Sequence, residues 1–132
     1  SDLFIAKKII GAFPAQSVKI LLRIYETGDE ITRGNIISIS GELADSPAIR
    51  KMLVSALDDK TVCEDSYEEV AGNPLRICDA AYNQLVRYHD VTNTQPILGS
   101  IHSLADRDRL INRLKTVKPE LGKPKKPDGL TL

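Results

Sequence analysis

The sequence is poor in the residues that build aromatic binding sites. Tryptophan is absent, and aromatic residues make up only 5% of the 132 residues. This scarcity argues against aromatic cages and against platforms on which nucleic-acid bases stack. No apolar run approaches the roughly 18 residues from which a membrane-spanning helix is built, so we expect no such helix.

Neither sign of charge dominates. The 18 Lys and Arg residues balance the 18 Asp and Glu residues, and the formal net charge is zero. A domain that binds nucleic acid usually carries a basic excess, so this balance argues against nucleic acid as the partner. The length, with 42% hydrophobic and 27% charged residues, is that of one globular domain with a single modest core.

Cysteine is also scarce. Cys63 and Cys78 are the only two, and their spacing is neither that of a zinc knuckle nor that of a redox motif. We expect two free thiols, with Cys78 buried on a helix and Cys63 in a loop. A disulfide between them is the alternative and would indicate an exported protein.

The first residue is Ser1 rather than Met, which is compatible with a trimmed chain or a removed signal peptide. The cytoplasm is the favoured compartment, and an exported form stays open.

Helical periodicity is what the sequence has in abundance. Apolar residues recur at helical spacing in six segments, and no segment alternates as a strand. The stretch 36–40 is rich in β-branched isoleucine, but its length and its neighbours favour a helix. The predicted apolar positions, segment by segment, are Leu3, Ala6, Ile10 and Phe13; Val18, Leu21, Leu22 and Tyr25; Ile36, Ile39 and Leu43; Ile49, Met52, Leu53, Ala56 and Leu57; Leu75, Cys78, Tyr82, Leu85 and Val86; Leu104, Leu110, Ile111, Leu114 and Val117.

Helix boundaries are predicted from caps and prolines. Ser46-Pro47 and Asn73-Pro74 each combine a capping residue with proline at the first helical position, which predicts the starts of the fourth and fifth helices. Ser103 and Asp106 have the spacing of a capping box. The remaining boundaries are predicted at Pro14, Gly28 and Asp29.

No catalytic, metal or cofactor motif is found in the sequence. His89 is expected to pack at a helix end, and His102 to be a solvated loop residue. The acidic stretch 58–72 lacks the ligand spacing of a calcium loop, so we interpret it as a solvated connector or as an insertion that touches a partner. Residues 119–132 are rich in Pro, Gly and Lys and are predicted to form a disordered basic tail after a helical domain at 1–118.

An internal repeat relates two helix pairs to each other. The segment 21–26 (LLRIYE) is matched by 53–58 (LVSALD), and each would end the first helix of a pair. Thr32-Arg33 then begins one second helix, and Leu75-Arg76 begins the other. Over about residues 15–88 this pattern resembles HEAT repeats, in particular the short bacterial HEAT-like repeats. The chain departs from that family at Thr32, where an aliphatic residue is usual, and in the length of the 58–72 loop.

The resemblance implies an all-α fold in which antiparallel helix pairs stack into a short α-solenoid. Each pair buries only one side of itself, so the first and last helices would serve as partial units at the ends of the stack. The second helices of such a solenoid line its concave surface. We therefore expect Arg33, Asn35, Ser38 and Glu42 to be exposed on one second helix, and Arg76, Asp79, Asn83 and Arg87 to be exposed on the other.

From these residues we select the candidate partner-binding set Arg33, Arg76, Asp79, Asn83 and Arg87. A structural role is the alternative for three of them. Arg76 and Asp79 are spaced to form an ion pair within one helix. The resemblance also suggests that Arg33 and Arg76 bond to the turn of a neighbouring repeat, for instance to Asp29 or Asp59.

The function that follows is that of a non-catalytic scaffold or adaptor that binds another protein and needs no cofactor. A HEAT-like protein of the bilin-lyase type, or one associated with nucleic acid, is the alternative. A lyase would require a larger pocket and more aromatic residues, and a nucleic-acid protein would require a more basic groove. A plain helical bundle is a third reading of the fold.

Overall fold

The computed structural model describes residues 2–43, 45–63, 73–88, 99 and 101–117. The predicted tail at 119–132, His89 and most of the acidic loop therefore lie outside the described residues. The helices are α1 (Asp2–Ala12), α2 (Pro14–Thr27), α3 (Glu30–Ser40), α4 (Pro47–Ala56), α5 (Ile77–Tyr88) and α6 (Leu104–Thr116), with a 3₁₀ turn η1 (Gly41–Leu43) after α3.

The described residues contain no β-strand, which confirms the all-α prediction. The isoleucine-rich stretch 36–40 is helical, as expected. None of the described helices is both long enough and apolar enough to span a bilayer.

Local side-chain capping accounts for three of the helix starts, those of α3, α4 and α6. The carboxylate of Asp29 accepts the Thr32 N–H at 2.8 Å and caps α3. Ser46 and Ser103 cap α4 and α6 in the same manner, and Pro47 occupies the first turn of α4. These side chains satisfy backbone N–H groups that have no partner within the helix, so the four-residue patterns in the sequence are sufficient to predict them.

The start of α5 differs from the prediction. Asn73-Pro74 does not begin the helix, which starts three residues later at Ile77. Its first N–H groups are satisfied by the segment 59–61, because Ile77 N–H donates to the Thr61 carbonyl and Cys78 N–H to the Asp59 carbonyl, both at 2.8 Å. A segment distant in sequence has replaced the local cap.

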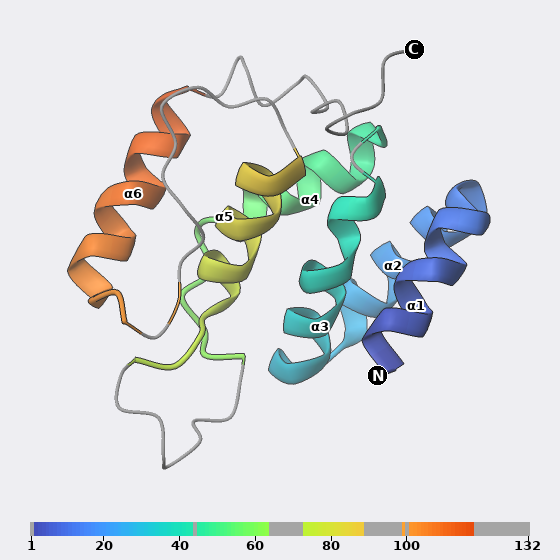
Figure 1. The fold of residues 1–132 in the computed structure, drawn as a ribbon, viewed down its shortest axis with the longest axis horizontal. Helices are drawn as coiled ribbons and strands as arrows, with labels where there is room; N and C mark the ends of the chain where they lie inside the picture. The colour runs from blue at the N-terminus through green and yellow to red at the C-terminus, as the bar shows by residue number, and fades with distance from the viewer. Residues whose placement is uncertain (1, 44, 64–72, 89–98, 100, 118–132) are drawn as a thin grey trace.

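The helices pack in two layers (Figure 1). In this view α1, α3, α5 and α6 follow one another across the front, and α2 and α4 lie behind them. α2 packs against α3 and α4 against α5, and these two pairs meet through α3 against α5 and α2 against α4. α1 packs on α3 and η1, and α6 packs on α5. The core therefore lies mainly between the two helix pairs.

The buried side chains follow the predicted periodicity in the middle of the chain. The four predicted positions in α4 and Leu57 just after it are buried, and α5 contributes Cys78, Tyr82 and Leu85. The prediction is wrong at Phe13, whose side chain is 57% exposed, and at Leu104, which is 42% exposed. Both residues lie at a helix end: Phe13 is between α1 and α2, and Leu104 is the first residue of α6.

Candidate functional site

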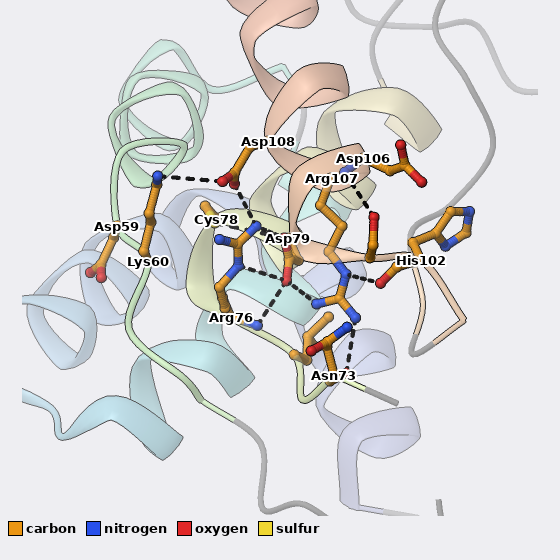
Figure 2. A network of polar contacts seen from close by, with 12 residues as sticks. Asp59, Lys60, Asn73, Arg76, Cys78, Asp79, His102, Asp106, Arg107 and Asp108 are labelled. Carbon is orange, nitrogen blue, oxygen red and sulfur yellow. Dashed lines mark hydrogen bonds and ion pairs between the residues drawn. The ribbon is translucent and has the colours of Figure 1, made fainter. Parts of the chain in front are cut away.

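A network of charged side chains is buried between α5 and α6 (Figure 2). Asp79, on the first turn of α5, is completely buried and accepts hydrogen bonds from two arginines. Arg76 lies on one side of it and Arg107, from α6, on the other.

Arg76 binds Asp79 through both its backbone and its side chain. Its N–H donates to Asp79 Oδ2 at 3.1 Å, its Nε to the same oxygen at 3.2 Å and its Nη2 to Oδ1 at 3.0 Å. The carboxylate thus satisfies the backbone N–H of the residue just before α5 and is also the partner of a fork-shaped guanidinium. The predicted ion pair between these residues is confirmed.

Arg107 is a charged residue with no exposed surface. Its Nη1 donates to Asp79 Oδ2 at 2.6 Å and to the Pro74 carbonyl at 2.9 Å. Its Nη2 donates to the carbonyls of Asn73 and Gly99, both at 2.9 Å, and its Nε to the His102 carbonyl at 3.2 Å. A guanidinium has five N–H donors, and here these bonds reach five different acceptors. Arg107 therefore joins α5, the segment before it and the segment before α6.

Asp108 extends the network towards the surface. It accepts from Arg76 Nη2 at 2.8 Å and, on its other oxygen, from Lys60 at 3.5 Å. Burial raises the pKa of Asp108, but the hydrogen bond and the charge of Arg76 outweigh burial and leave that pKa below its ordinary value. Burial likewise lowers the pKa of Arg76, and its bonds to Asp79 and Asp108 outweigh burial, so the guanidinium stays charged.

The two arginines and two aspartates carry balanced charge. A buried ion is tolerated only when it is paired and its remaining hydrogen-bonding groups are satisfied, and both conditions hold for Asp79 and Arg107. The geometry is that of a structural anchor between α5 and α6, because the polar atoms point at one another and at backbone carbonyls.

A small cleft borders the network. Its volume is about 80 Å³, and its lining residues are Leu57, Asp58, Lys60, Cys78, Asp108, Ile111, Asn112 and Lys115. It has room for a few water molecules and is far smaller than a typical organic-ligand pocket. Ion pairs of Lys60 with Asp108 and of Lys115 with Asp58 join its polar groups.

Both cysteines are buried free thiols. Cys78 lies on α5 as predicted, and Cys63 is a buried loop residue. Burial, followed by the charge of Asp79, raises the pKa of the Cys78 thiol to about 12. A thiol with such a pKa is protonated at neutral pH and is a poor nucleophile.

The predicted site residues separate into two groups. The expectation that Arg76 and Asp79 are exposed is wrong, because they are 5% and 0% exposed and are directed into the network. Arg33 is half-buried rather than exposed, and it donates to Asp59 at 2.9 Å, which is the bond to a neighbouring turn that the HEAT-like resemblance suggested. The guanidinium of Arg33 also lies 5.9 Å from the ring centroid of Tyr25.

Arg87 is exposed, as predicted. The expectation that Asn83 is exposed is wrong, because its side chain is half-buried one turn before Arg87. Close to Arg87 in sequence, Tyr88 donates from its hydroxyl to Glu42 at 3.0 Å, and Gln84 accepts the Gly41 N–H at 3.0 Å. These bonds tie α5 to η1. Arg33, Asn83 and Arg87 remain candidate partner contacts.

Arg107 was not among the predicted site residues, although its position in the apolar pattern of α6 indicates that it is buried. Arg107 precedes Leu110, Ile111 and Leu114 by three, four and seven residues, so it lies on the apolar stripe of α6. Asp79 likewise occupies a position on the buried side of α5, among its apolar residues. Two opposite charges at core positions of neighbouring helices predict a buried ion pair, but only once the two helices are known to pack together.

His102 is half-buried rather than solvated. Its Nδ1 accepts the Gly99 N–H at 3.0 Å, and its ring points away from Arg107 (Figure 2). Among the residues that the structure describes, no group of three or more His, Cys, Asp or Glu side chains is placed to hold a metal ion.

Comparison with known proteins gives no match of any kind: no family model, no curated protein and no solved structure resembles the chain significantly.

Proposed function

We propose that the chain is a short HEAT-like helical stack that serves as a non-catalytic protein-binding module. The observation that carries this proposal is the relation between its two helix pairs. α2/α3 and α4/α5 pack first helix against first helix and second helix against second helix, as repeats of this kind do. Arg33 of one pair also bonds to Asp59 in the turn of the next.

The binding contacts are assigned to the side of α5 that carries Asn83 and Arg87. Arg76 and Asp79 are directed inward, which removes them from a partner surface. Arg87 is exposed at the end of α5, and arginine is among the residues that contribute most to protein interfaces.

The test is the combined substitution Asn83→Ala and Arg87→Ala. The partner is first recovered from an extract with the wild-type chain, purified, and then titrated by calorimetry against both proteins. We expect affinity to fall about tenfold or more while the melting temperature stays near that of the wild type. Arg113→Ala, on the exposed side of α6, is the matched control and should bind normally.

Equal binding by the double variant would contradict this assignment. Loss of binding on Glu68→Ala and Glu69→Ala instead would move the contact to the acidic 58–72 segment.

A further inference from the structure

The two ends of the helix stack differ in surface character. Most exposed residues of α6 are polar, namely Asp106, Arg109, Asn112, Arg113 and Thr116, and the exposed apolar residues Leu104 and Ala105 lie together at its start. The opposite end, formed by α1 and α2, exposes more large apolar side chains. Stacked helical proteins stay soluble when their terminal units have polar outer surfaces, and α6 comes nearer to that condition than α1 and α2 do.

The apolar end consists of five large side chains that remain exposed. Ile5 is 57% exposed, Ile9 54%, Phe13 57%, Ile20 56% and Ile24 37%. By contrast, Ile10 and Leu21 are the only large apolar side chains of α1 and α2 that are buried among the described residues. Single exposed apolar residues need no explanation, but a set gathered on two adjoining helices marks an interaction surface.

The five residues follow the helical register. Ile5 and Ile9 are four residues apart on α1, and Ile20 and Ile24 are four residues apart on α2, with Phe13 between the two helices. Phe13 belongs to both rows, because its N–H donates to the Ile9 carbonyl and its own carbonyl accepts the Ser17 N–H. The two rows therefore meet at Phe13. We refer to these five residues as the apolar end face.

The charged residues of α1 and α2 are mostly cations, and the exceptions are Asp2 at the start of α1 and Glu26 near the end of α2. Residues 3–25 contain four cations (Lys7, Lys8, Lys19 and Arg23) and no acidic residue, in a chain whose overall net charge is zero. Lys19 and Arg23 are exposed and lie four residues apart, in a row beside that of Ile20 and Ile24.

We propose that the apolar end face binds an amphipathic helix of another protein whose apolar stripe is flanked by Asp or Glu. Rows of isoleucine at four-residue spacing form the ridges that fit the grooves of a second helix. The cation row beside them would face the carboxylates of that helix. This inference concerns a different surface from the Asn83 and Arg87 contact and does not rest on it.

Two other occupants fit the charge pattern less well. A symmetric pairing of two copies would place the same surface against itself and bring like charges together. A lipid surface is usually engaged through Trp, Phe or Leu, whereas four of these five residues are isoleucine.

The experiment is a selection on the intact, immobilised chain. The probe is a library of helical peptides of about 18 residues, or five turns, with a fixed leucine stripe and with flanking positions varied among Glu, Gln and Lys. We expect the retained peptides to be enriched in Glu. Retention should fall about tenfold for Ile5→Gln/Ile9→Gln and for Ile20→Gln/Ile24→Gln. Ile101→Gln is the matched control, because Ile101 is 90% exposed but lies just before α6, and it should retain peptides normally.

The decisive variant is Lys19→Glu/Arg23→Glu. It should reverse the selection so that peptides rich in Lys are retained, a change that loss of folding cannot produce. Equal retention of Glu and Lys peptides, or retention unaffected by these substitutions, would overturn the proposal. Two further results would overturn it in favour of another occupant: binding to phosphatidylserine vesicles with no peptide enrichment, or concentration-dependent dimerisation in sedimentation that Ile5→Gln/Ile9→Gln abolishes.

Discussion

Arg107 shows how one residue can hold distant parts of the chain together. Its five donors are all used, and four of the five acceptors are backbone carbonyls from the segments before α5 and before α6. The fifth is the buried carboxylate of Asp79. A single side chain therefore fixes α6, both of those segments and the first turn of α5.

Replacing Arg107 with lysine should destabilise the protein although the charge is kept. Lysine has three donors and no planar fork, so at least two buried acceptors would lose their hydrogen bonds. We expect a loss of about 2–4 kcal/mol in the free energy of unfolding, measured by urea denaturation. Arg113→Lys, on the exposed side of the same helix, should change it by less than about 0.5 kcal/mol. Similar effects of the two substitutions would contradict the role given to Arg107.

At the scale of the helices, two glycines lie in opposite environments. Gly11, in α1, has no atom near the position that a Cβ would take. In α3, a Cβ on Gly34 would lie 2.6 Å from the Cβ of Cys63, because the segment after α4 crosses α3 at that point. Gly34 is therefore needed in α3 because a larger residue would collide with Cys63. Gly11 makes room for nothing and only weakens α1.

The two alanine substitutions should change stability in opposite directions. Gly11→Ala should stabilise the protein by up to about 1 kcal/mol, since alanine is the better helix former. Gly34→Ala should destabilise it by about 1–3 kcal/mol, because Cys63 must move to make room. Thermal melts of the two variants provide the measurement, and a stabilising Gly34→Ala would show that the crossing segment is not packed as described.

The helices show which parts of the fold a sequence can predict. Asp29, Ser46 and Ser103 act on residues three positions away, so their capping is written in a short stretch of sequence. The start of α5 was mispredicted, because its cap comes from residues 59 and 61 and becomes available only after α4 and α5 have packed. The burial of Arg76 and Asp79 depends on Arg107 and Asp108 of α6 in the same way, and spacing within one helix could not reveal it.

For the whole molecule, the ion pairs predict sensitivity to acid. Burial raises the pKa of Asp59 and Asp108, but their hydrogen bonds and neighbouring cations leave both pKa values below normal. The Thr61 N–H and Arg33 act on Asp59, and Arg76 acts on Asp108. When the pKa of a carboxyl group is lower in the folded state, the unfolded chain binds more protons at low pH. The free energy of unfolding therefore decreases as the pH decreases.

Stability should therefore hold near neutral pH and decline as the pH drops below about 4, the ordinary carboxyl range. Urea midpoints measured from pH 7 to pH 3 would test this expectation. Asp108→Asn should lower the midpoint at neutral pH and flatten its decline in acid, because this carboxylate no longer titrates. A urea midpoint that stays constant or increases as the pH is lowered from 5 to 3 would contradict the lowered pKa values given to Asp59 and Asp108.

The backbone acceptors of Arg107 also bear on how this chain tolerates sequence change. Every residue type supplies a carbonyl, so the side chain at position 73 can be exchanged without removing an acceptor from the guanidinium. Asp79 and Arg107 have no such latitude, because a change in either one leaves a buried charge without its counterpart. Mutational drift at this junction should therefore be tolerated in the connecting segment and blocked at these two positions, unless both change together.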